Sequence, residues 1–318
     1  MIRLSPAELP SWCKCGLHKL TMLVSDSTWT HLRIPFFFLL SPVYFFSWSQ
    51  VVTGEWSWFE AALIFVLPHF LLYPAANGYN SYFDKDEGSI GILEKPPTVT
   101  DELYWTTWAL EGIAVLVGAV LLNSSFLATA LLGVVFSKAY SHPAVRIKAY
   151  PILSWILVPV VQGYCSILGI TGALLSSSTG YQDMRIHLAG ILTTLQLLAF
   201  YPMGQVYQHD EDRKRGDMTI SLVLGVRGTF KLAWCCAAVA NAGFLLYFVT
   251  YYKNYGTVCL ALLGSLVPPT VYAWGWSRRV WADEKAADFK GTMKLFWLGA
   301  MCNNLFYMWL TYFTYMYE

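Results

Sequence analysis

The chain has 318 residues, of which 56% are hydrophobic and only 13% are charged, and its net charge is +1. Soluble domains carry roughly 25% charged residues, so this composition excludes an ordinary water-soluble globule and indicates an integral membrane protein. A nearly neutral chain without a basic field also gives no reason to expect a nucleic-acid partner, and we expect a small or lipidic partner within a lipid bilayer instead.

Apolar runs long enough to cross a bilayer, which takes about 20 residues in a helix, recur along the chain. They predict an all-α polytopic membrane protein with about nine transmembrane helices in one bundle, at residues 34–53, 57–79, 103–122, 126–141, 151–172, 187–208, 229–251, 256–276 and 293–316. The run at 126–141 is the weakest of these, because it is short and ends in Lys138. We expect a cytoplasmic N-terminal segment over residues 1–33 and a single transmembrane domain over residues 34–318.

Basic residues near the span ends indicate the orientation, because Lys and Arg favour the cytoplasmic side. With the N-terminus in the cytoplasm, 19 of the 21 Lys and Arg residues fall on that side, and only Arg185 and Lys253 fall on the other. We therefore expect a multi-pass protein, located in a bacterial inner membrane, whose N-terminus is cytoplasmic and whose C-terminus is outside. The long polar loops then form a cap on the cytoplasmic face.

One polar segment occurs twice in the chain, 128 residues apart. The first copy reads Tyr73-Pro74-x-x-Asn77-x-Tyr79-Asn80-x-x-x-Asp84-Lys85-x-x-Gly88, and the second reads Tyr201-Pro202-x-x-Gln205-x-Tyr207-Gln208-x-x-x-Asp212-Arg213-x-x-Gly216. Because four predicted helices separate the copies, both ends emerge on the same side of the membrane. The repeat is therefore a parallel duplication, unlike the inverted repeats of many transporters.

Each copy places amide, amide and carboxylate at i, i+3 and i+7, which puts them on one face of a helix as it leaves the membrane. Mg²⁺ prefers oxygen ligands and is typically bound by one or two carboxylates plus substrate phosphates. The repeat therefore predicts a magnesium site. Its candidate ligands are Asn80, Asp84, Gln208 and Asp212, with further carboxylates at Asp86, Glu87, Asp210 and Glu211. The alternative is a pair of solvated helix ends, which repetition of the whole pattern disfavours.

A basic turn lies between the two copies, on the same predicted face: Tyr140-Ser141-His142-Pro143-Ala144-Val145-Arg146-Ile147-Lys148. A diphosphate needs cationic donors as well as a metal, and Arg makes bidentate phosphate contacts while Lys acts as a point charge. Arg146 and Lys148 are the natural candidates. The alternative is that both are ordinary basic residues of a cytoplasmic loop.

These motifs resemble those of the UbiA superfamily of intramembrane prenyltransferases over roughly residues 33 to 230. The family pattern has nine helices, a first motif N-D-x-x-D-x-x-x-D, a loop similar to Y-S-x-P-x-x-R-x-K, and a second motif D-x-x-x-D-x-x-x-G followed by Thr and Leu-Gly. The chain reads Asn80-Ser81-x-x-Asp84-x-x-x-Gly88 in the first and Gln208-x-x-x-Asp212-x-x-x-Gly216-x-x-Thr219 in the second, with Leu224-Gly225 beyond. The loop from Tyr140 to Lys148 matches almost completely.

The chain departs from the family pattern at three acidic positions, where Ser81, Gly88 and Gln208 stand instead of Asp. Either some metal-binding carboxylates have moved, to Asp86 or Glu87 in the first copy and to Asp210 in the second, or the metal is bound more weakly.

The resemblance implies ionisation of a prenyl diphosphate and capture of the allylic carbocation by a hydrophobic acceptor such as an aromatic compound, a quinone precursor, a carotenoid or a lipid. It implies Mg²⁺ as cofactor, catalytic roles for Asp84, Asp212 and Tyr140, and diphosphate contacts from Arg146, Lys148, Asn77, Asn80, Gln205 and Gln208. A terpene cyclase of the same superfamily, which needs no acceptor, is one alternative. A transporter or lipid-binding protein without catalysis is another.

Two further residues carry open predictions. Glu111 lies well inside the third predicted span, where an ionisable group is a functional candidate, so it either contacts the acceptor or packs as a protonated residue. His209 is next to Asp210 and is a candidate base, although a lone His of this kind usually has no such role.

Overall fold

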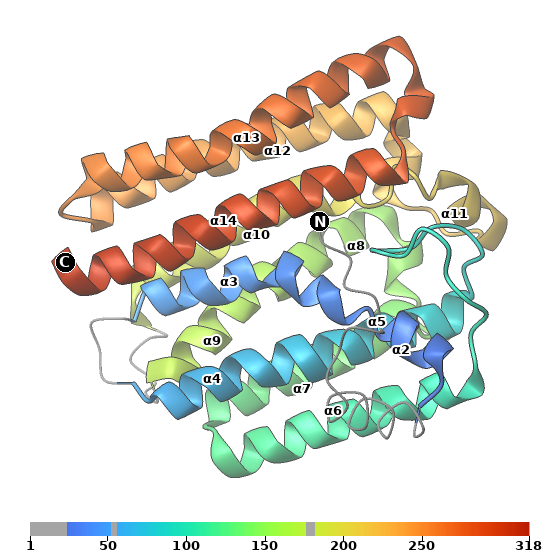
Figure 1. Ribbon diagram of the computed structural model, residues 1–318, viewed down its shortest axis with the longest axis horizontal. Helices are drawn as coiled ribbons and strands as arrows, with labels where there is room; N and C mark the ends of the chain where they lie inside the picture. The colour runs from blue at the N-terminus through green and yellow to red at the C-terminus, as the bar shows by residue number, and fades with distance from the viewer. Residues whose placement is uncertain (1–23, 52–55, 176–181, 318) are drawn as a thin grey trace, which may run out of the picture.

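The computed structural model describes residues 24–51, 56–175 and 182–317, and their regular structure is helical apart from one isolated bridge between Ile90 and Leu93 (Figure 1). The α-helices are α2 (Asp26–Leu32), α3 (Phe37–Ser49), α4 (Trp58–Leu67), α5 (Tyr73–Asp84), α6 (Asp101–Leu121), α7 (Ser124–Ser141), α8 (Pro151–Pro159), α9 (Ser166–Leu175), α10 (Met184–Met203), α11 (His209–Arg215), α12 (Ile220–Tyr251), α13 (Tyr255–Ala282) and α14 (Phe289–Tyr317). Short 3₁₀ or π segments join several of them: η2 (Ile34–Phe36), η3 (Pro68–Leu72), η4 (Ile147–Ala149), η5 (Val160–Cys165) and η7 (Glu284–Ala286). The predicted all-α class is confirmed for the described residues.

Seven helical segments in the described part of the chain are long and apolar enough to cross a membrane: Asp26–Ser49, Trp58–Asp84, Asp101–Leu121, Pro151–Leu175, Met184–Met203, Ile220–Tyr251 and Tyr255–Ala282. They correspond to seven of the nine predicted spans. The other two, at 126–141 and 293–316, fall on α7 and α14, which run alongside the remaining helices of the bundle (Figure 1). That α7 and α14 also cross the membrane stays a prediction.

Two spans contain a π-helical segment at about mid-length. The helix of α4 continues through η3 into α5, and that of α8 continues through η5 into α9. Each π segment begins at or directly after a proline, Pro68 or Pro159. Proline lacks an amide hydrogen, and a break of this kind is tolerated in a membrane helix where neighbouring groups satisfy the backbone. In η5 the amide of Tyr164 is satisfied by the hydroxyl of Thr194 on α10, at 3.0 Å.

Hydrogen bonds between helices fix several helix pairs, as expected where lipid removes the hydrophobic drive for helix association. Asn304 on α14 accepts from Ser41 at 2.9 Å and donates to the carbonyl of Phe38 on α3 at 3.1 Å. Trp155 on α8 donates to the carbonyl of Leu198 on α10 at 3.0 Å. These contacts set the relative positions of the helices that surround the central cavity.

The polar connections of the chain gather at one end of the bundle. There the 85–100 loop, between α5 and α6, lies near α11, whereas α14 ends at the opposite end of the bundle (Figure 1). Only the last part of the predicted N-terminal segment 1–33 belongs to the described residues, and it forms α2, which packs against α5. The repeated segments therefore meet at a single polar end, as a parallel duplication requires.

Candidate active site

The first copy of the repeated segment forms α5, and Asn77, Asn80 and Asp84 lie on one face of it. The amide of Asn80 donates to Asp84 Oδ2 at 2.8 Å and to Ser141 Oγ on α7 at 3.2 Å. The helix ends directly after Asp84, because Lys85 adopts a left-handed conformation with φ 49°. The carboxylate therefore lies at the C-terminal end of the helix. The helix dipole is negative there and favours the binding of cations over anions.

The second copy is not the continuous helix that its spacing predicts. α10 ends at Met203 instead of residue 208, and the chain makes tight turns until α11 begins at His209. In these turns the backbone amide of Gln205 donates to the carbonyl of Pro202 at 3.1 Å, and the backbone amide of Gln208 donates to the carbonyl of Gln205 at 3.0 Å. Pro202 weakens the helix by lacking an amide hydrogen, and Gly204 is a poor helix former.

As a consequence, the side-chain amides of Gln205 and Gln208 have different partners. Gln205 is buried, and its Oε1 accepts from the amide of Ser221 at 3.4 Å. Gln208 donates to the carbonyl of Ser89 at 3.2 Å, which joins the second copy to the 85–100 loop. The two amides thus stabilise this end of the cavity and still line it.

The basic loop brings its two cations to the carboxylates, as its position between the copies predicts. Lys148 forms an ion pair with Asp84, and Arg146 lies 3.7 Å from the same carboxylate. Arg146 also donates to both oxygens of Asp217, at 2.7 and 2.9 Å. Its backbone is left-handed, with φ 46°, which costs a non-glycine residue about 1–3 kcal/mol. The bidentate contact with Asp217 offsets that cost.

A third cation, Arg215 at the end of α11, connects three carboxylates. It forms an ion pair with Asp86 and donates to Asp212 at 2.9 Å and to Asp217 at 3.2 Å. Gly216 then takes a left-handed conformation with φ 75°, which turns the chain so that Asp217 reaches the cluster. Thr219 donates to the second oxygen of Asp212 at 3.1 Å. We call the side chains of Asp84, Asp86, Arg146, Lys148, Asp212, Arg215 and Asp217 the charged cluster.

Two carboxyl groups of the charged cluster have opposite pKa shifts. Burial raises the pKa of Asp212 to about 7, and the nearby carboxylates of Asp217 and Asp84 contribute to the rise. Burial also tends to raise the pKa of Asp217, but hydrogen bonds and charges from Arg146, Lys148 and Arg215 outweigh it, so the pKa of Asp217 lies below its ordinary value. Asp217 is therefore a permanent counter-ion, whereas an incoming cation competes with a proton for Asp212 near neutral pH.

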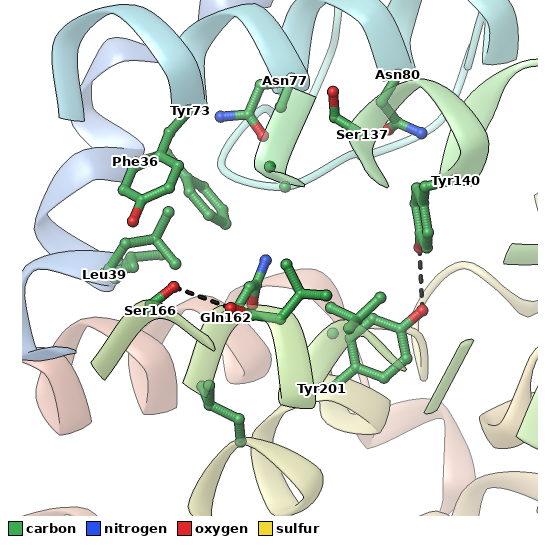
Figure 2. A pocket seen from close by; sticks show the side chains of 18 of the residues that line it. Phe36, Leu39, Tyr73, Asn77, Asn80, Ser137, Tyr140, Gln162, Ser166 and Tyr201 are labelled. Atoms are coloured by element: carbon green, nitrogen blue, oxygen red, sulfur yellow. Dashed lines mark hydrogen bonds between the residues drawn. The ribbon is translucent and has the colours of Figure 1, made fainter. Parts of the chain in front are cut away.

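The members of the charged cluster other than Arg146 line the mouth of a cavity of about 480 Å³, and Arg146 lies behind them, bound to Asp217. Residues from both copies line this cavity, namely Asn77, Asn80, Asp84, Gln205, Gln208 and Asp212. Farther inside, most of the lining is apolar and comes from α3, α7, α9, α10 and α14. Tyr140 on α7 and Tyr201 on α10 meet across it with their hydroxyl oxygens 3.0 Å apart (Figure 2). The cavity thus joins a highly charged mouth to an apolar interior.

Some candidate residues lie away from the charged cluster. The side chain of Asp210 is 90% exposed and forms an ion pair with Arg213 at 3.0 Å, and Glu87 is exposed as well. Glu211 pairs with Lys214 at 3.0 Å. Of the carboxylates suggested as replacements for the missing family residues, Asp86 faces the cavity and Asp210 does not.

His209 and Glu111 have partners of their own. His209 is buried, lies 2.7 Å from the hydroxyl of Ser221 and is not among the residues that line the cavity. Glu111 on α6 lines the cavity, and its Oε2 lies 2.7 Å from the ammonium of Lys138 on α7. Lys138 also lies over the ring of Tyr79, 3.7 Å from its centroid. The pair joins α6 to α7, so Glu111 has a packing role whether or not it contacts a ligand.

The donor set suits a hard cation that shares its ligands with a substrate. Among the described residues, no three His, Cys, Asp or Glu side chains form a group that would hold a metal ion by themselves. Asp86 Oδ2 is buried and accepts no hydrogen bond from any described residue, and Asp84 and Asp212 lie at the same mouth. Mg²⁺ commonly binds one or two carboxylates and completes its shell with phosphates and water, which fits this arrangement.

Three residues of the mouth have no place in the motif-based prediction. Asp217 and Arg215 flank Gly216, and their proximity to Asp212 was the available signal. Arg33 is buried at the mouth and donates to the carbonyl of Asn77 at 2.6 Å and to Ser81 Oγ at 3.0 Å. Ser81 stands where the family pattern has Asp, so a hydroxyl here faces the guanidinium.

Comparisons with known proteins identify the family. Residues 35–301 match the UbiA prenyltransferase family. The fold is similar to structures of a UbiA homologue from Archaeoglobus fulgidus bound to DMAPP and Mg²⁺ (TM-score 0.66) and to GPP and Mg²⁺ (TM-score 0.65), each 16% identical and matched over 92% of this chain and 100% of that chain. A digeranylgeranylglyceryl phosphate synthase structure is also similar, with a TM-score of 0.54 and 12% identity over 92% of this chain and 98% of that chain. No curated protein matches the sequence. Because the family match spans most of its length, the chain belongs to the UbiA prenyltransferase family.

Proposed function

We propose that the protein transfers a prenyl group from a prenyl diphosphate to a hydrophobic acceptor within the membrane, with Mg²⁺ as cofactor. The observation that carries this proposal is a cavity with an apolar interior whose mouth combines four buried or half-buried carboxylates with Lys148 and Arg215, while Arg146 lies 3.7 Å from one of those carboxylates, Asp84. A diphosphate with an isoprenoid tail has the same division of charge. The similar structures of the A. fulgidus homologue hold such diphosphates with Mg²⁺.

The proposal gives roles to five members of the charged cluster. Arg146 and Lys148 bind the diphosphate oxygens, since guanidinium and ammonium groups are suited to phosphate. Asp84, Asp86 and Asp212 would hold Mg²⁺ together with the amide oxygens of Asn80 and Gln208. When bound, Mg²⁺ supplies positive charge that stabilises the departing diphosphate. The cations that now pair with these carboxylates then turn to the phosphates.

The reaction breaks the C1–O bond of the prenyl diphosphate, and the electron pair leaves with the diphosphate. The allylic carbocation is exposed to the ring faces of aromatic side chains in the cavity, including Tyr140 and Tyr201 (Figure 2). Such faces attract cations, and the apolar lining excludes water that would capture the carbocation. An electron pair of the acceptor then forms the new bond to C1, and the acceptor loses a proton.

Diphosphate release from purified protein in nanodiscs tests this proposal, with Mg²⁺, prenyl diphosphates of several lengths and candidate acceptors. We expect Asp84→Asn and Asp212→Asn to reduce diphosphate release to background, because each variant removes a negatively charged oxygen ligand for Mg²⁺ from the mouth. Glu94→Gln is the matched control, since Glu94 is an exposed carboxylate whose only described ion pair, with Lys290, lies at the surface.

The remaining alternatives give different results in the same assay. Release that does not depend on any acceptor indicates cyclisation, as in the terpene cyclases of the superfamily. No release by the unmodified protein under any condition contradicts an enzymatic function and favours a transporter or lipid-binding protein. Full activity of both Asp variants refutes the proposed site.

A further inference from the structure

Several neutral polar side chains line the interior of the cavity beyond the charged cluster, and Tyr73, Asn77 and Gln162 are three of them. Tyr73 and Asn77 point into it from α5, and Gln162 points into it from the opposite wall at η5 (Figure 2). No described residue forms a hydrogen bond with the hydroxyl of Tyr73 or with the side-chain amides of Asn77 and Gln162. Unpaired polar groups within membrane spans are costly and usually functional, so these groups call for a ligand with hydrogen-bonding atoms.

The direction of Gln162 is fixed by the π segment that contains it. The next residue, Gly163, lies so close to α10 that a Cβ atom there would be 2.7 Å from Thr194 Oγ1. Thr194 also accepts from the amide of Tyr164 at 3.0 Å. With η5 held against α10 in this way, Gln162 is directed into the cavity instead of toward α10. π segments of this kind are frequent at functional sites.

Tyr73 is positioned by the other π segment. His69 in η3 is buried, and its Nδ1 lies 2.7 Å from the carbonyl of Phe65, to which it donates. The ring of Tyr73 packs edge-on against that of His69, with centroids 5.1 Å apart and an interplanar angle of 85°. Both π segments contribute to the cavity wall, and each helps to hold one unpaired polar side chain in a defined direction.

The charges around the cavity restrict what these groups can bind. Apart from Arg33 and the charged cluster, which lie at the mouth, Glu111 is the one charged side chain of the described residues that lines the cavity, and it is paired with Lys138. An acceptor carboxylate in the interior would therefore meet no free cation. Burying an unpaired charge costs far more than burying a hydrogen-bonded hydroxyl.

We propose that the acceptor is an uncharged, largely apolar molecule with a hydroxyl or carbonyl group, and that Gln162 and Tyr73 position it through that group. This inference rests on the proposed prenyl transfer. Gln162 offers both a donor and an acceptor, and Tyr73 offers a hydroxyl that does either. The acceptor so held supplies the electron pair for the bond to C1 of the prenyl chain and releases its proton to the departing diphosphate, which keeps the electrons of the broken C1–O bond.

The acceptor class is tested with neutral and carboxylated probes of matched shape. Protein in nanodiscs receives Mg²⁺, radiolabelled geranyl diphosphate and either methyl 4-hydroxybenzoate or 4-hydroxybenzoate, and in a second pair 1,4-dihydroxynaphthalene or 1,4-dihydroxy-2-naphthoate. Diphosphate release and prenylated product are measured separately. We expect product from the neutral member of each pair and at least about tenfold less from its carboxylated partner, because roughly 1.4 kcal/mol of desolvation already gives that factor.

Two variants then test the positioning residues. Gln162→Met and Tyr73→Phe each remove one hydrogen-bonding group with little change in volume. We expect either to raise the KM of the neutral acceptor about threefold to tenfold, as for the loss of a neutral hydrogen bond, without changing the KM of geranyl diphosphate. Asn241→Leu is the matched control, because Asn241 is an amide in a span that lines a second, smaller cavity and not this one.

The outcomes separate this inference from the proposed function. Absence of diphosphate release from the unmodified protein contradicts prenyl transfer and this inference together. Release without product from either neutral probe, preference for the carboxylated probes, or an equal rise in both KM values overturns the acceptor assignment while prenyl diphosphate ionisation stands. An unchanged acceptor KM in both variants overturns the roles of Gln162 and Tyr73.

Discussion

At the scale of single residues, Asp217 determines the positions of the basic-loop side chains. It accepts from Arg146 at 2.7 and 2.9 Å and from Arg215 at 3.2 Å, and Lys148 lies 3.8 Å away. Asp217 is buried, and its lowered pKa keeps it charged throughout the neutral range. The guanidinium of Arg146, on a left-handed backbone, has no other bidentate partner in the described part of the chain.

We therefore expect Asp217→Asn to slow diphosphate release about a hundredfold, because a small displacement of a phosphate-binding group is enough for a loss of that size. Steady-state release with geranyl diphosphate measures the effect. Asp210→Asn is the matched control: its exposed ion pair with Arg213 is worth about 0–1 kcal/mol, so its rate stays within about fivefold of the unmodified protein. A larger loss of diphosphate release in Asp210→Asn than in Asp217→Asn contradicts the role assigned to Asp217.

The sequence was informative for those site residues whose positions depend on local geometry alone. Asn77, Asn80 and Asp84 share a face because they lie in one regular helix, so their spacing was enough to predict it. Asp217 joins the site only through the left-handed turn at Gly216 and through Arg146, which is 71 residues away in the chain. No periodicity encodes such a contact, and the motif therefore suggested Asp210 instead.

At the scale of helices, the same distinction separates the two copies of the repeat. The apolar runs predicted where seven spans lie, with ends that differ from the observed ones by up to nine residues, because length and hydropathy decide where a helix can cross a bilayer. The end of α10 was wrong by five residues, since helix propensity at Pro202 and Gly204 overrides the repeat pattern. The sequence did not predict the π segments or the direction of Gln162 either, because a π turn shifts the side-chain register away from the regular helical period.

The contact between α6 and α7 depends on a buried ion pair. Glu111 and Lys138 are 3% and 14% exposed, and no other described carboxylate pairs with Lys138. Lys138→Met leaves Glu111 without its counter-ion, and breaking a buried pair in this way costs about 3–5 kcal/mol. We expect that loss in the free energy of unfolding measured in mixed detergent and SDS micelles.

The double variant Glu111→Gln with Lys138→Met separates packing from ligand contact. Since it buries no unpaired charge, most of the lost stability should return. If Glu111 serves only to join the helices, the double variant also recovers product formation. Recovery of stability without recovery of product formation assigns Glu111 a contact with the acceptor, and a single variant as stable as the unmodified protein contradicts the ion-pair argument.

At the scale of the whole molecule, the helix arrangement brings the polar segments to one end of the bundle, and the charge distribution predicts on which side of the membrane that end lies. The 85–100 loop and α11 share one end of the bundle, and that end carries the charged cluster (Figure 1). The positive-inside rule predicts that this end faces the cytoplasm. In that orientation the proposed diphosphate substrate would enter from the cytoplasm, and the proposed acceptor and the isoprenoid tail would occupy the part of the cavity within the bilayer.

This orientation predicts opposite labelling of two exposed lysine positions. Lys95 lies in the 85–100 loop and Lys253 lies between α12 and α13, so cysteines placed there in a variant without the seven native cysteines should face opposite sides. A membrane-impermeant maleimide applied to intact cells should label Lys253→Cys and reach Lys95→Cys only after lysis.

A cysteine at Glu318 extends the test to α14: with nine spans it is labelled in intact cells, because an odd number of crossings separates it from the cytoplasmic N-terminus. Labelling of all three only after lysis contradicts the orientation, whereas failure at Glu318 alone shows that α14 does not complete a crossing.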